Sequence, residues 1–206
     1  MRLIRSTIAI LAIVSASASL AGEVGTVSYG AIFANKNCAW CHGPSLQGFA
    51  TAPRLAGQKP QYLMIQLHSF RDHTRDNPLS QDYMWGAAAN HLSYETAREL
   101  AAYVASLDTK AANNGHRVLI AVGHTLYREG SPATNIPSCV ACHGPNAEGF
   151  GEIPRLGGLS YHYLKRRLGE WGEGYHLTAA APMPEVASKL SPDEIDALAS
   201  YLSFLN

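Results

Sequence analysis

Apolar residues recur with a helical period in four stretches of the chain. In each half, one stretch carries apolar residues at positions i, i+4 and i+7, and a later stretch carries an apolar face of similar spacing. This spacing predicts amphipathic helices, because residues three and four apart share one face of a helix. No stretch shows the sustained alternation of a β-strand, so we expect an all-α fold. The four apolar faces are Leu63, Leu67 and Phe70; Ala97, Leu100, Ala101 and Val104; Leu164, Leu168 and Trp171; and Ile195, Leu198, Ala199 and Leu202.

Local signals also mark where the last of these helices begins. Ser191 stands at the N-cap, Pro192 at the first helical position, and Glu194 three residues after the cap. Serine with a glutamate three residues later is a capping box, and proline is tolerated at the first position of a helix. The final helix is therefore predicted to begin at Pro192.

The two halves are copies of one unit. Residues 38–67 align with residues 139–168 at an offset of 101 without a gap, and 14 of the 30 positions are identical. The similarity resumes between residues 92–107 and residues 190–205. Repetition at this scale predicts two tandem domains. We assign residues 22–107 to the first, the polar segment 108–115 to a linker, and residues 116–206 to the second.

The first 21 residues are typical of a secretory signal peptide. Arg2 and Arg5 precede the apolar run 8–14, which is followed by small residues. We expect cleavage after Ala21, with cleavage after Ala18 as the alternative, and a periplasmic mature protein. The whole chain has 16 basic and 16 acidic residues, so removal of the two arginines leaves 14 against 16, a net charge of −2. This balance argues against a nucleic-acid partner.

All four cysteines belong to two Cys-x-x-Cys-His motifs, "CAWCH" at 38–42 and "CVACH" at 139–143. Two thiols at this spacing can add to the two vinyl groups of one haem, and the following histidine can coordinate its iron. A zinc site shared between the halves, a redox disulfide and inter-domain disulfides are the alternatives. None of these requires a histidine after both cysteine pairs, so the motifs favour covalent haem at Cys38, Cys41, Cys139 and Cys142.

The chain resembles the dihaem cytochromes c of the cytochrome c4 type in nearly its whole length after residue 21. "CHGP", "PRLAG", "QYL" and the "LS…LA.Y" pattern of the last helix carry the resemblance. It implies two tandem cytochrome c-like domains, each wrapped around one covalently attached haem c, and domains that face each other through their propionate edges.

The ligand at the sixth coordination position of each haem iron decides the function. Methionine there gives a high-potential electron carrier, whereas a vacant position is typical of an enzyme or a ligand sensor. His42 and His143 are the expected fifth ligands. Met84 and Met183 follow these histidines by 42 and 40 residues, each just ahead of the last helix of its unit. Paired placement, and the resemblance, favour them as sixth ligands. Met64 aligns with a lysine and is expected in the core.

The resemblance also implies the groups around each haem. The carbonyl groups of Pro53 and Pro154 would accept a hydrogen bond from the axial histidines, which fixes the histidine tautomer. Arg54 and Arg155 would bind haem propionates, although a solvated arginine is the simpler alternative. Tyr62 and Tyr163 could bind a propionate or could fill the core. The remaining histidines have no counterpart in the other unit, so surface or satisfied core positions are expected for them.

An exported single-electron carrier is the favoured function. Its partners would be redox proteins, with a dehydrogenase or quinol-oxidising complex as donor and an oxidase as terminal acceptor, while peripheral membrane association is left open. The alternative is a dedicated cytochrome subunit of a periplasmic dehydrogenase, for example a flavocytochrome or quinoprotein. A dihaem peroxidase would require Met84 or Met183 to leave its iron.

Overall fold

The computed structural model describes residues 28–48, 51–89, 92–176 and 181–206. The predicted signal peptide lies outside these residues. Helices and helical turns form the regular structure of the described residues, where strand-like pairing is limited to two isolated bridges, Ser131–Ile136 and Phe150–Ile153. The all-α prediction is confirmed.

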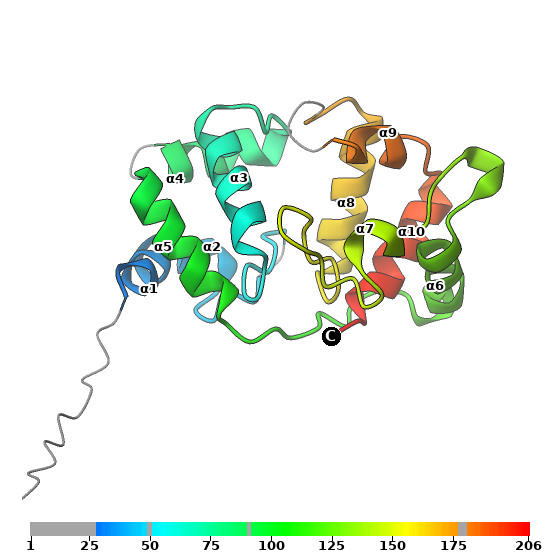
Figure 1. Ribbon diagram of the computed structural model, residues 1–206, viewed down its shortest axis with the longest axis horizontal. Coiled ribbons are helices and arrows are strands. Elements are labelled where there is room, and N and C mark those ends of the chain that lie inside the picture. The colour runs from blue at the N-terminus through cyan, green and yellow to red at the C-terminus, as the bar shows by residue number, and fades with distance from the viewer. Residues whose placement is uncertain (1–27, 49–50, 90–91, 177–180) are drawn as a thin grey trace, which may run out of the picture.

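The helices form two units that lie side by side (Figure 1). The first unit contains α1 (Tyr29–Phe33), the π-helical turn η1 (Ala34–Cys38), α2 (Ala39–His42), α3 (Pro60–Arg71), the π-helical turn η2 (Ser80–Trp85), α4 (Gly86–Ala89) and α5 (Tyr94–Ala105). The second contains the 3₁₀ turn η3 (Arg117–Leu119), α6 (Ile120–Glu129), the 3₁₀ turn η4 (Pro132–Thr134), α7 (Val140–His143), α8 (Tyr161–Gly172), α9 (Met183–Ala187) and α10 (Pro192–Ser203).

The last helix organises the core of each unit. Helix α5 packs against α1 and α3, and α10 packs in the same way against α6 and α8. Both first helices cross the last helix at a glycine. A Cβ atom at Gly30 would lie 2.3 Å from the carbonyl oxygen of Glu99, and one at Gly123 would lie 2.1 Å from that of Ala197. The repeat therefore extends to α1 and α6, which the sequence alignment did not reach.

Helix α10 begins as predicted. The Ser191 hydroxyl accepts the backbone N–H of Glu194, and the Glu194 carboxylate accepts the backbone N–H of Ser191 at 2.8 Å. Two of the N–H groups that lack a partner at a helix start are satisfied in this way. Pro192 occupies the first turn, where a missing N–H costs nothing.

The segment between the units is extended and hydrogen-bonded to both. Residues 108–114 have no regular secondary structure. The amide of Gln47 donates to the carbonyl of Asp108 at 2.7 Å, and the backbone N–H of Asn113 donates to the carbonyl of Ser203 at 2.9 Å. The segment is thus a strap fixed on the first unit at one end and on the second at the other.

Side chains of the first unit also hold a loop of the second directly. The guanidinium of Arg54 donates to the carbonyl groups of Gly157 at 2.6 Å, Gly158 at 3.1 Å and Lys110 at 2.7 Å. The amide of Gln58 pairs with the backbone of Arg155, donating to its carbonyl at 2.9 Å and accepting from its N–H at 2.8 Å. These bonds fix the two units against each other.

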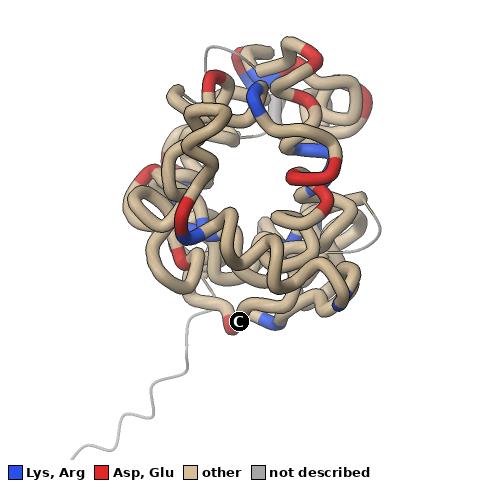
Figure 2. The backbone as a smooth tube through the Cα atoms, turned by 90° about the vertical axis from the view of Figure 1, so that its right-hand side faces the viewer, with Lys and Arg blue, Asp and Glu red and all other residues tan. Residues whose placement is uncertain are grey.

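Acidic and basic positions are interspersed along the backbone of the described residues (Figure 2). None of the helices in that part of the chain has the length and apolar character needed to cross a membrane.

Candidate functional site: two histidine–methionine pairs in one cavity

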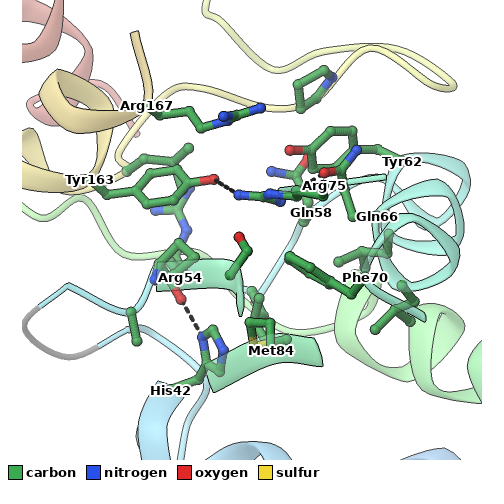
Figure 3. Close-up of a pocket in the computed structure, with 18 of the residues that line it drawn as sticks. His42, Arg54, Gln58, Tyr62, Gln66, Phe70, Arg75, Met84, Tyr163 and Arg167 are labelled. Carbon is green, nitrogen blue, oxygen red and sulfur yellow. Dashed lines mark hydrogen bonds between the residues drawn. The ribbon is translucent and has the colours of Figure 1, made fainter. Parts of the chain in front are cut away.

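A cavity of about 660 Å³ is lined by residues of both units and of both predicted sites. Figure 3 shows the part of it around His42, Met84 and Tyr163. Its walls come from α3 and α8, from the two Cys-x-x-Cys-His segments and from the loops after them. Most of its lining is apolar, with leucines, Phe33, Phe70 and Trp171 among the lining residues. An apolar cavity with a few converging polar groups is typical of a cofactor site.

The first motif brings a neutral histidine to this cavity. Helix α2 ends at His42 because Gly43 follows with φ of +81°. His42 is only 5% exposed, and its Nδ1 lies 2.7 Å from the carbonyl oxygen of Pro53. A carbonyl only accepts, so Nδ1 carries the proton and Nε2 keeps its lone pair for a metal. Burial lowers the pKa of His42, against the opposing effect of the Pro53 bond, which favours the neutral ring.

The second motif repeats this arrangement. Gly144 ends α7 with φ of +83°, and Nδ1 of His143 lies 3.0 Å from the carbonyl oxygen of Pro154. Burial lowers the pKa of His143 as well. Both histidines and both prolines line the cavity. The geometry is the one that the family resemblance implies, because a backbone carbonyl orients each ring.

The cysteines of the motifs are free thiols on the same helical turns. Cys38 and Cys139 are half-buried, whereas Cys41 and Cys142 are exposed. Burial raises the pKa of Cys38 to about 11 and that of Cys139 to about 11, so these two thiols are poor thiolates.

Each unit also brings a methionine to the cavity. Met84 lies in η2 and Met183 begins α9, and both line the cavity. Met64, which the sequence assigns to the core, is partly buried and packs against the apolar cluster of the first unit. The structure therefore places all four predicted axial ligands, His42, Met84, His143 and Met183, on the walls of one cavity.

The predicted propionate-binding residues are placed unequally. Tyr62, Tyr163 and Arg54 line the cavity, whereas Arg155 is half-buried and is not among the lining residues. Both Nη atoms of Arg54 are committed to carbonyl groups between the units, which leaves its buried Nε without a partner among the described residues. Arg54 thus holds the interface, and only its Nε is free to meet a propionate.

Several cationic residues of the cavity were missed by the sequence analysis. Arg75, Arg166 and Arg167 line it together with Arg54, while no Asp or Glu is among the lining residues of the described chain. The buried Nε of Arg75 also lacks a partner there. A comparison of the two halves could have pointed to Arg75 and Arg167. At the offset of 101 each arginine stands opposite an uncharged polar residue, His176 and Gln66, so the two halves differ in charge there.

The residues of this cavity fit two haem groups. Buried guanidinium groups require counter-charges, and two haems bring four propionates into a cavity whose own lining provides no carboxylate. Each neutral imidazole offers a lone pair to iron, and the apolar walls keep water away. A bound haem supplies a one-electron Fe(III)/Fe(II) couple, while the chain holds, orients and tunes it.

Comparison with known proteins gives the same family for both units. The model of the cytochrome c family matches residues 28–108 and 120–206. The thiosulfate dehydrogenase electron acceptor of Stutzerimonas stutzeri (strain A1501) is 38% identical over 172 residues, which are 81% of this chain and 77% of that protein. Cytochrome c4 of Thiocapsa roseopersicina is 34% identical over 194 residues, 90% of this chain and 96% of that protein.

Solved structures agree with the sequence comparisons. The structure of cytochrome c4 from Acidithiobacillus ferrooxidans matches with a TM-score of 0.77 at 28% identity, and the match covers 82% of this chain and 99% of that one. The fold, the duplicated motif and these relatives lead to one assignment. The chain belongs to the cytochrome c family, as a dihaem electron carrier of the cytochrome c4 type with two haem c groups.

Proposed function

We propose that the chain is an exported electron carrier in which Cys38 with Cys41, and Cys139 with Cys142, attach the two haems. In this proposal His42 with Met84, and His143 with Met183, are the axial ligand pairs. The observation that carries the proposal is the repeated site: each histidine has its Nδ1 on a proline carbonyl and shares the cavity with a methionine of its own unit. Methionine on both irons gives high potentials and leaves neither iron open for a peroxidase reaction.

Substitution of single ligands tests this assignment. Met84→Ala and Met183→Ala are each expected to remove one of two sulfur–iron charge-transfer bands in the near infrared. Met64→Ala is the matched control, because this methionine packs on the apolar core, and it should leave both bands in place. Cys142→Ala should halve the number of covalent haems in a pyridine haemochrome assay. A wild-type spectrum with the signature of two histidines on either iron would contradict the assignment.

We further propose that the electron donor is a periplasmic dehydrogenase of small inorganic sulfur compounds. The relative that is 38% identical is named as the electron acceptor of thiosulfate dehydrogenase, which favours such a donor over an alcohol-oxidising quinoprotein. Stopped-flow mixing of the oxidised protein with a thiosulfate dehydrogenase and thiosulfate should reduce both haems. Mixing with thiosulfate alone is the control and should leave them oxidised. Absence of reduction in the first experiment would remove this donor and leave the haem assignment untouched.

A further inference from the structure

The two units place their buried charges differently at the interface. Two pairs of equivalent positions, 101 residues apart, carry different side chains. Gln66 on α3 corresponds to Arg167 on α8, and Arg75 after α3 corresponds to His176 after α8. At these two pairs of positions, each unit therefore contributes one buried arginine, but from a different element, while Arg54 is a further buried arginine of the first unit. The haem environments of the two units cannot be electrostatically equal, although their predicted ligands are the same.

The hydrogen bonds of the buried Arg75 side chain go to neutral groups. Its side chain is 7% exposed, its Nη1 donates to the amide oxygen of Gln66 at 2.7 Å, and its Nη2 lies 3.4 Å from the hydroxyl oxygen of Tyr163 across the interface. The guanidinium lies 4.7 Å from the centre of the Phe70 ring (Figure 3). Its Nε has no partner among the described residues. No carboxylate of those residues forms an ion pair with it, and the adjacent Asp76 accepts the backbone N–H of His176 instead.

Arg167, in contrast, has its counter-charge within the protein. Its Nη1 lies 2.9 Å from Oε2 of Glu170, and the other oxygen of this carboxylate accepts from the amide of Asn77 at 3.0 Å. Glu170 is itself 5% exposed, and Arg166 lies 3.4 Å from its Oε1. The buried cluster thus combines Arg75 and Arg167 with Glu170, which is the only buried carboxylate in the described part of the chain, and its net charge is positive.

Burial, together with the excess of positive charge, lowers the pKa of His176 and of Arg167. His176 is 1% exposed, so it lies in the interior and not at the surface. Burial, and then the charges of Arg167 and Arg75, lower its pKa to about 3, so the ring adds no further charge. Burial and the charge of Arg75 also lower the pKa of Arg167.

We propose that Arg75 is a positioning residue that binds a haem propionate at the interface, and that its charge raises the reduction potential of that haem above the potential of the other. This inference rests on the proposed function, because it requires a haem in the cavity. A buried charge without a counter-ion is strongly unfavourable, and no side-chain carboxylate of the described residues lines the cavity. A fixed positive charge nearby disfavours Fe(III) relative to Fe(II), and water screens it poorly in a buried site.

A redox titration of the two haems at pH 8, where a propionate is ionised with or without the arginine, tests the proposal. In Arg75→Gln we expect the Fe(III)/Fe(II) ratio of one haem to rise about tenfold at a fixed electrode potential, which is a shift of about 59 mV to lower potential. The other haem should move less. Arg75→Lys keeps the charge and should restore most of the potential. Arg71→Gln is the matched control, since this arginine lies at the exposed end of α3.

Glu170→Gln gives an independent test of opposite sign. Removal of this carboxylate leaves the charge of Arg167 without its partner, so we expect at least one potential to rise. The proposal is wrong if, in Arg75→Gln, the Fe(III)/Fe(II) ratio of each haem changes by less than twofold, which corresponds to roughly 18 mV. It is also wrong if Glu170→Gln lowers the potentials or leaves them unchanged. Should Arg75→Gln fail to fold, the Glu170→Gln result decides alone. The near-infrared bands of the same samples report the axial ligands separately, so a failure of the ligand assignment is recognised independently.

Discussion

Replacement of Arg54 by methionine should separate the two units before it disturbs either haem site. Arg54 is 4% exposed, and its guanidinium bonds three carbonyl groups that belong to the strap and to the second unit. Methionine fills a similar volume but cannot donate a hydrogen bond. The first unit would then keep its core, while the carbonyl groups of Gly157, Gly158 and Lys110 would lose their shared donor.

The expected cost follows from these bonds. A hydrogen bond from a charged donor contributes about 1.5–3 kcal/mol, so three of them contribute about 5–9 kcal/mol before other effects are counted. Burial of the guanidinium opposes folding by several kcal/mol, and this cost disappears in the variant. Burial also lowers the pKa of Arg54 to about 10, with a contribution from Arg155, which reflects the same cost. We therefore expect the free energy of unfolding to fall by about 3 kcal/mol.

Urea unfolding of the dihaem protein, followed by tryptophan fluorescence and by Soret circular dichroism, measures this loss. Trp40 and Trp85 lie in the first unit and Trp171 in the second, so fluorescence reports on both. Arg155→Met is the matched control, because the interface bonds of Arg155 to Gln58 are made by its backbone and not by its side chain. The reasoning is refuted if Arg54→Met unfolds at the same urea concentration as the wild type, or if Arg155→Met is destabilised equally.

Two further substitutions test the support of the second unit. Tyr127→Phe should lower the free energy of unfolding by about 1–2 kcal/mol, because the fully buried phenol donates to the carbonyl of Gly144 at 2.6 Å; a thermal melt checks this, and an unchanged melting temperature would contradict it. Ser191→Ala should cost about 1 kcal/mol through loss of the capping box of α10, and more than Ser93→Ala, whose cap lacks the reciprocal glutamate bond. Equal losses in the two serine variants would show that the reciprocal bond contributes nothing.

The parts of the fold that depend on local sequence could be predicted. Helices α3, α5, α8 and α10 carry apolar faces of helical period, and α10 carries its own start signal at Ser191. Helices α1 and α6 were missed. Helix α1 has only five residues, and in both helices the residue that crosses the last helix is a glycine. Gly30 and Gly123 matter only through a close crossing with a distant helix, and no periodicity in their own segments reveals it.

The candidate site divides in the same way. The proline that orients each histidine lies eleven residues after it, and duplication makes the motif and the proline recognisable. The role of Arg54 in holding the second unit was not predicted, because its partners lie 56 to 104 residues away. The buried pair of Arg167 and Glu170 looks on the sequence like an ordinary i, i+3 surface pair. Its burial follows only from the docking of the two units.

The docking of the units and the binding of the haems are therefore expected to stabilise each other. The cavity is lined by residues of both units, and Arg75 reaches Tyr163 across the interface. A group that binds only the docked arrangement stabilises that arrangement by linkage. Without propionates, the positive charges of Arg75 and Arg167 repel each other at the interface and oppose docking. With propionates in place, the same charges would hold the units together, so loss of one haem should weaken the interface as well as the site that lost it.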